Sequence, residues 1–156
     1  MDSIVYKPKT GPTLLMGCGV VPDDLAYYAS NGSYSVEEGI GSVVFGTTAS
    51  TVADVYVSFP VDLTGYSTLK AYFSHRYGSY NIIETLAISV AGAQNVRTSY
   101  TTINNTDTGS VNTGNLLTLD VSEYSGTYYV AVGINTGGSS WSNARDRIVC
   151  AAVTAE

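Results

Sequence analysis

The sequence has few charges and almost none of the residues that usually build catalytic or metal sites. Charged side chains make up 13% of the 156 residues, about half the share of roughly 25% found in typical soluble domains. The single histidine, His75, has no cysteine or second histidine at ligand spacing, which argues against zinc. It ends a predicted strand, and we interpret it as an exposed strand terminus and not as a general base. We predict no metal site and no cofactor.

Sequence motifs of the common enzyme classes are also missing. No serine lies in a G-x-S-x-G elbow, and no glycine-rich loop has the spacing that cradles a phosphate. The acidic pairs 23–24 and 37–38 are adjacent residues in predicted turns, where solvation is the usual state of a carboxylate. Asn105, Asp107 and Gly109 resemble part of a calcium loop, but the terminal bidentate glutamate is missing. We therefore expect a protein that is not an enzyme.

Basic residues are too scarce to form a nucleic-acid surface. There are 7 lysines and arginines against 13 acidic residues, giving a net charge of −6, whereas phosphate binding needs clustered positive charge. No apolar run approaches the roughly 20 residues needed to cross a bilayer, and Met1 is not followed by a basic and apolar leader. Neither a nucleic-acid partner nor membrane insertion is predicted.

The two cysteines, Cys18 and Cys150, lie near opposite ends of the chain. One alternative is a disulfide between the first and last strands. We favour two buried free thiols, because free cysteine is among the most buried residue types.

Hydroxyl groups and strand-forming residues take the place of the missing charges. The chain has 18 serines, 18 threonines and 13 tyrosines, and β-branched threonine and valine suit strands. Residues 53–74 have the clearest period of two, which indicates a half-buried strand on each side of a corner. The apolar positions of this alternation are Val55, Val57, Phe59, Leu69, Ala71 and Phe73.

A corner motif, D-[L/V]-[S/T]-x-Y, occurs twice, at residues 62–66 and 120–124, and a good strand follows each copy. Aspartate, serine and threonine side chains can bond the backbone of their own turn, and the tyrosine can pack over it. We predict that these residues are structural and set where the strands turn: Asp62, Thr64, Tyr66, Asp120, Ser122 and Tyr124.

Elsewhere, short candidate strands alternate with turn signals. Asn31-Gly32 predicts a hairpin, Asp23 or Asp24 can cap a short helical turn reaching Tyr28, and 96–103 reads as an edge strand. About nine to ten strands at this spacing predict an all-β, antiparallel jelly-roll-like β-sandwich. We assign residues 13–156 to this single domain and residues 1–12 to an extended arm, whose assembly residues would be Tyr6, Lys7 and Lys9.

Aromatic residues in loops are the most suggestive functional feature. Trp141 lies in a Gly/Ser loop, and Tyr77 and Tyr80 flank a turn beside Arg76. Such residues can stack on sugar rings, and they equally suit protein interfaces, where tryptophan, tyrosine and arginine act as anchors. We select these four as candidate ligand- or partner-binding residues.

The segments V-x-F-P-V-D-L-T-G-Y-S-T-L-K-A-Y-F and L-T-L-D-V-S-E-Y-S-G-T-Y-Y-V-A-V resemble jelly-roll sandwich modules. These include carbohydrate-binding modules and domains of bacteriophage tail, fibre and head-decoration proteins. The resemblance covers about residues 33–135. In the carbohydrate-binding modules it implies aromatic residues that stack on the ligand from a concave face or from loops.

The choice between these two functions depends on how the chain is organised. It is small, starts at Met1 without a leader, carries an arm and has no attached catalytic domain. We therefore expect a non-enzymatic bacteriophage virion protein, a capsid decoration, head fibre or tail subunit. Its partners would be other virion proteins and further copies of itself, with a host surface glycan as an additional ligand. The alternative is an extracellular carbohydrate-binding module that recognises glycans through its loop aromatics.

Overall fold

The computed structural model describes residues 11–37, 39–47, 54–77, 85–97, 101–102, 115–135 and 147–156. Within these ranges the chain forms strands and turns and no helix. The strands are β1 (Thr13–Gly17), β2 (Ala26–Ser30), β3 (Gly32–Val36), β4 (Val43–Thr47), β5 (Asp54–Asp62), β6 (Thr68–Tyr77), β7 (Thr85–Ala91), β8 (Thr101–Thr102), β9 (Asn115–Asp120), β10 (Thr127–Asn135) and β11 (Arg147–Ala155).

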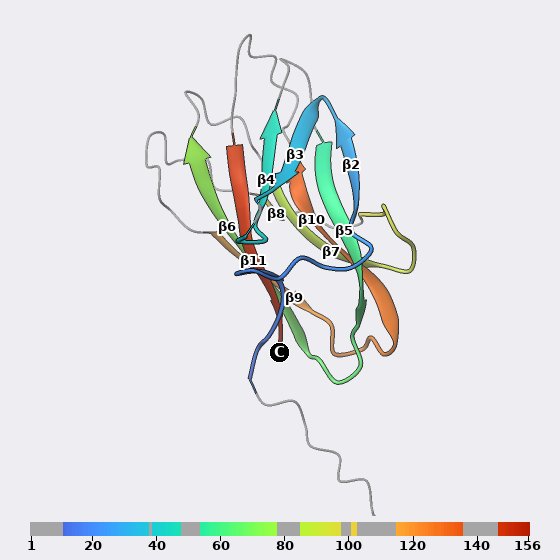
Figure 1. The fold of residues 1–156 in the computed structure, drawn as a ribbon. Helices are drawn as coiled ribbons and strands as arrows, with labels where there is room; N and C mark the ends of the chain where they lie inside the picture. Colours follow the sequence, from blue (N-terminus) through green and yellow to red (C-terminus); the bar gives the residue numbers. More distant parts are fainter. Residues whose placement is uncertain are drawn as a thin grey trace, which may run out of the picture.

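The strands form two antiparallel sheets that pack face to face (Figure 1). The first sheet has the order β3-β4-β11-β6-β9, with β1 also paired to β11, and the second has the order β2-β5-β10-β7-β8. The predicted jelly-roll-like, all-β sandwich is therefore confirmed. No helix in the described ranges is long and apolar enough to cross a membrane.

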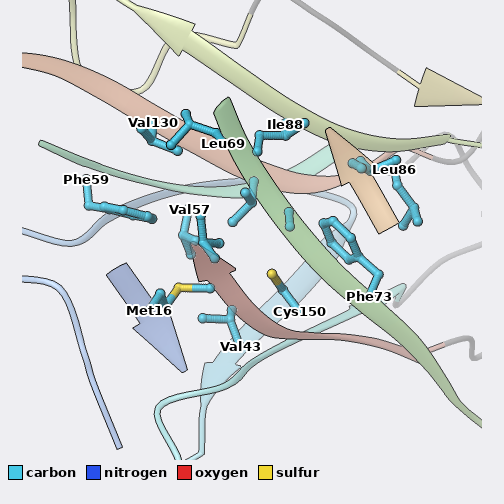
Figure 2. Packing of buried hydrophobic residues seen from close by; sticks show 14 of the residues in the cluster. Met16, Val43, Val57, Phe59, Leu69, Phe73, Leu86, Ile88, Val130 and Cys150 are labelled. Atoms are coloured by element: carbon cyan, nitrogen blue, oxygen red, sulfur yellow. The ribbon is translucent and has the colours of Figure 1, made fainter. Parts of the chain in front are cut away.

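The core lies between the sheets and contains the apolar positions of the predicted alternation. Val55, Val57 and Phe59 of β5 point inward and are at most 1% exposed, and Leu69, Ala71 and Phe73 of β6 face them from the first sheet. Figure 2 shows how side chains from both sheets meet. Burying such residues is the main favourable term in folding.

The second sheet is built around the pair β5–β10. Nine residue pairs run from Thr127–Asp62 to Asn135–Asp54 without a shift in register. Because side chains alternate along a strand, this register places Tyr56 and Ser58 together on the outer face of the sheet, turned away from the core. The candidate functional site lies on this outer face.

The first corner is a compact turn whose backbone is fixed by its own side chain. Asp62 Oδ1 accepts the Thr64 N–H at 3.0 Å, and the Tyr66 N–H donates to the Leu63 carbonyl at 3.1 Å. Gly65 is the third residue of the turn that this Tyr66–Leu63 hydrogen bond closes. Its φ is 84°, a conformation that glycine adopts at little cost. Tyr66 is 6% exposed, so its ring belongs to the core.

The second corner repeats this arrangement. Asp120 Oδ1 accepts the Ser122 N–H at 2.9 Å and the Ser122 hydroxyl at 2.7 Å, while the Tyr124 N–H donates to the Val121 carbonyl at 2.9 Å. These hydrogen bonds lower the pKa of the Asp120 carboxyl below its ordinary value of 3.8. Tyr124 is 37% exposed, and its ring contacts Tyr128 edge-on.

The two corners also contact each other directly. Thr64 Oγ1 accepts the Gly126 N–H at 2.9 Å, and the Leu63 N–H donates to the Gly126 carbonyl at 3.0 Å. The Thr64 hydroxyl therefore bonds the loop after the second motif, while the Thr64 N–H bonds Asp62 within its own turn. The pair of corners closes one end of the sandwich.

Three expectations about local structure were wrong. Asn31 has φ of 54° and links β2 of the second sheet to β3 of the first, so it makes a crossing between sheets and no hairpin. The helical turn expected to reach Tyr28 is strand β2, which pairs with β5. Cys150 is a buried free thiol as expected, but Cys18 is exposed, because it lies in the tight turn where Gly17 and Val20 exchange backbone hydrogen bonds.

Candidate functional site

Of the residues predicted to bind a ligand or partner, Arg76 and Tyr77 lie within the described ranges. Arg76 and Tyr77 are the last two residues of β6, in the first sheet. Trp141 and Tyr80 lie outside the described residues, as do Tyr6, Lys7 and Lys9 of the arm. The functional roles of these residues stay predictions.

A stacked pair of tyrosines lies on the outer face of the second sheet. Tyr28 of β2 and Tyr56 of β5 are directly opposite in the antiparallel register. Their ring centroids are 5.2 Å apart and the ring planes differ by 22°, which is a favourable offset stack. Tyr56 is 6% exposed and Tyr28 is 45% exposed, so Tyr28 presents the pair to solvent.

Arg97 supports Tyr56. Its guanidinium carbon lies 4.9 Å from the Tyr56 ring centroid, within range of a cation–π interaction. The guanidinium also forms an ion pair with Asp54 and donates to the Ile134 carbonyl at 3.4 Å. The Arg97 side chain is 1% exposed, against 28% for Asp54, so the arginine is buried and its carboxylate partner reaches the surface.

Residues 92–97, which we call the strap, leave β7 and cross the outer face of the second sheet. The Tyr56 hydroxyl donates to the Asn95 carbonyl at 2.8 Å, and the Asn95 N–H donates to Ser58 Oγ at 3.4 Å. Gln94 Nε2 donates to the Asp24 carbonyl, just before β2, at 2.7 Å. Figure 1 shows this yellow segment beside the lower end of β2. The strap is thus fastened to β5 and to the segment that enters β2.

The sheet has small side chains where the strap crosses it. Ser58, Ala87, Ser89 and Ala131 are fully buried although they point away from the core. Their neighbour Gly133 has no room for a side chain, because a Cβ there would lie 2.1 Å from the Val55 carbonyl oxygen. Small residues allow the strap and Arg97 to approach the strands closely.

A second aromatic pair closes the margin of the sandwich. Tyr27 of β2 and Tyr34 of β3 have ring centroids 4.2 Å apart. They come from the first strand in each sheet order, so their contact bridges the two sheets. Tyr27 is 55% exposed, and β2 therefore presents adjacent tyrosines to its two faces.

Sequence reasoning missed Tyr28, Tyr56 and Arg97. Tyr28 was assigned to a helical turn, and the strong inward alternation of β5 drew attention away from its outward residues. One signal was available: Arg97 is the only lysine or arginine between Arg76 and Arg145. A single basic residue in so long a stretch is a good candidate for a specific partner.

The chemistry of this site is stacking and hydrogen bonding. The exposed ring of Tyr28 offers a flat apolar face, and the Asp54 carboxylate nearby can accept hydrogen bonds. In the described ranges, no group of three or more histidine, cysteine, aspartate or glutamate residues could hold a metal ion. The calcium-like fragment at 105–109 lies outside the described residues.

Comparisons with known proteins identify the fold. No protein-family model matches the chain, and no curated protein matches its sequence. Among solved structures, the K1 cleaved adhesin domain of Lys-gingipain from Porphyromonas gingivalis W83 is similar with a TM-score of 0.57 and 14% identity, over 94% of this chain and 98% of that one. A family 29 carbohydrate-binding module is similar with a TM-score of 0.52 and 12% identity, over 94% and 92% of the two chains.

These similarities concern the fold. The chain has the β-sandwich architecture of carbohydrate-binding modules and adhesin domains. The resemblance to carbohydrate-binding modules is supported to that extent, and the resemblance to bacteriophage virion proteins receives no support from the comparisons.

Proposed function

We propose that this domain is a non-enzymatic carbohydrate-binding module and that Tyr28 is its sugar-stacking residue. The observation that carries the proposal is the stack itself: Tyr28 is 45% exposed, and the buried Tyr56 lies behind it. An aromatic ring packs well against the apolar face of a pyranose, and polar groups at its rim give orientation. Similar structures include a carbohydrate-binding module, which agrees with this proposal.

The residues behind Tyr28 hold it in place before a ligand arrives. Tyr56 is fixed by Arg97 over its ring and by its hydroxyl bond to Asn95. We call the stacked pair Tyr28–Tyr56 the platform. Because the platform is already ordered, it loses little conformational freedom on binding, and this favours affinity. Asp54, oriented by Arg97, would accept hydrogen bonds from sugar hydroxyls at the rim of the platform.

This proposal replaces the virion protein that we expected from the sequence. Subunit assembly and a virion location have no supporting observation among the described residues or in the comparisons. An extracellular or surface-displayed location fits glycan binding, and we propose it together with the function.

The direct test is glycan-array binding of the intact chain and of Tyr28→Ala. We expect the variant to lose at least about tenfold in affinity, as removal of an aromatic anchor does at an interface, while Tyr28→Phe retains binding. Tyr72→Ala is the matched control, because Tyr72 is 40% exposed but lies on β6 of the other sheet. Equal binding by Tyr28→Ala and the parent chain would refute the assignment of the platform.

The loop aromatics Trp141, Tyr77 and Tyr80 are a second proposed contact set. Trp141→Ala in the same array separates them from the platform. If Trp141→Ala lost glycan binding and Tyr28→Ala bound fully, the binding site would lie in the loops and the proposed function would stand. Failure of the parent chain to bind any glycan would remove the function itself.

A further inference from the structure

On the outer face of the second sheet, the ring of Tyr28 is exposed, and the strap covers the strands beyond Tyr56. From this geometry we infer that the site takes a single, terminal sugar residue and not an internal stretch of a polysaccharide. The inference rests on the proposed function, since it specifies the ligand of the same platform.

The platform is one ring wide. Tyr28 is 45% exposed, but Tyr56, its neighbour on the next strand, is only 6% exposed. A pyranose and a tyrosine ring are of similar size, so Tyr28 accommodates one sugar ring. A chain lying across the strands would need further exposed rings in line with Tyr28, and Tyr56 is already covered by Arg97.

The strap closes the sheet beyond Tyr56. It bonds Tyr56 and Ser58 through Asn95, and it reaches Asp24 through Gln94. The surface that a second and third sugar would occupy is therefore already filled by protein. The complete burial of Ser58 and Ala131, both on this face, agrees with that filling.

The strap is anchored at several points along its length. Gln94 and Asn95 bond the protein near its middle, and Arg97 holds its end through Asp54 and the Ile134 carbonyl. Asn95 itself has φ of 58°, a left-handed conformation that asparagine tolerates better than most residues. The local sequence is thus compatible with the crossing conformation.

The open direction from Tyr28 leads off the sheet. β2 is the first strand in its sheet order, so no described strand lies beyond it. The rest of a glycan bound by its end could extend past β2 into solvent.

The test compares ligands of increasing length by calorimetry on the intact chain. The probes are the methyl glycosides of glucose, galactose, mannose and xylose, each with its β-1,4-linked disaccharide and hexasaccharide. For a sugar that binds, we expect affinities within about threefold across the three lengths, because each ligand contributes one bound residue. A hexasaccharide that binds more than about thirtyfold tighter than its methyl glycoside would overturn the inference while leaving the proposed function intact. Binding by none of the probes and by no glycan on the array would refute the proposed function, and this inference with it.

A variant tests whether the strap sets the limit. Tyr56→Phe keeps the ring that supports Tyr28 but removes the hydroxyl that holds Asn95. We expect it to gain affinity for the hexasaccharide relative to the methyl glycoside, with Gly92→Ala, which meets no atom within 4 Å, as the control. Tight binding of the hexasaccharide by the parent chain, or no change of this ratio in Tyr56→Phe, would contradict the role of the strap.

Discussion

The guanidinium of Arg97 lies over the ring of Tyr56, with 4.9 Å between the guanidinium carbon and the ring centroid. These residues are 41 positions apart in the sequence and belong to the strap and to β5. Through this contact, the residue that anchors the end of the strap by its ion pair with Asp54 also packs on the platform. Stability and binding should therefore respond together when it is removed.

Arg97→Met should lower the free energy of unfolding by about 2 kcal/mol. Removing one partner of a buried ion pair typically costs about 3–5 kcal/mol, and the exposure of Asp54 reduces this penalty because water can solvate its carboxylate. The double variant with Asp54→Asn should recover part of the loss, since no unpaired charge is then left. Urea denaturation gives the free energy of unfolding of the parent chain, of Arg97→Met and of the double variant. Equal values for the parent chain and Arg97→Met would contradict the role of the ion pair.

Gly133→Ala should be among the most damaging single substitutions in the second sheet. The added Cβ would lie 2.1 Å from the Val55 carbonyl oxygen and 2.6 Å from the Tyr56 Cα, so a strand must shift. We expect a loss of about 3 kcal/mol or more, as for severe overpacking, measured as a lower midpoint of urea unfolding. Gly92→Ala, in open space on the strap, is the control and should change stability by less than about 0.5 kcal/mol.

Stability should fall in acid partly through Asp120. The pKa of this carboxyl is lowered in the folded protein by its hydrogen bonds from Ser122. Because the pKa of Asp120 is lower in the folded protein than in the unfolded one, its ionised carboxylate stabilises the fold at pH values above 3.8. This stabilisation is lost as the pH falls from 3.8 through the pKa of the folded protein. Asp120→Asn keeps an acceptor oxygen but cannot titrate, so its melting temperature should depend less on pH between about 2 and 4. Identical pH profiles for the two proteins would contradict this assignment.

The two cysteines should differ in reactivity. Burial raises the pKa of the Cys150 thiol, which keeps it protonated and unreactive, whereas Cys18 is exposed in a tight turn. A thiol reagent at pH 8 should label Cys18 alone in the native protein and both residues in denaturant. Rapid native labelling of Cys150 would show that the core around it is open.

Much of the fold could be predicted from the sequence because the central strands bury alternate residues. Val55, Val57 and Phe59 pointed to β5, and the repeated motif located both corners. The connection at Asn31 was harder, because a turn residue with positive φ fits a hairpin and a crossing between sheets equally well. Which of them forms depends on the pairing of β2 with β5, far away in the sequence.

The candidate site was much less predictable. The strap was interpreted as a turn leading into an edge strand at 96–103, whereas residues 96 and 97 lie outside any strand and β8 is Thr101–Thr102. Arg97 becomes buried only because Asp54 and the Ile134 carbonyl converge on it. No local pattern encodes such a convergence, so composition and periodicity led instead to the loop aromatics.

The place of β11 in the first sheet has a consequence for biosynthesis. This strand, which comes last in the sequence, pairs with β1, β4 and β6. A nascent chain on the ribosome therefore holds three strands whose shared neighbour has not yet emerged from the exit tunnel. Their unpaired edges are open to wrong partners until residue 155 is free, since non-local pairing forms slowly and exposes strand edges. The first sheet can close only after β11 has emerged.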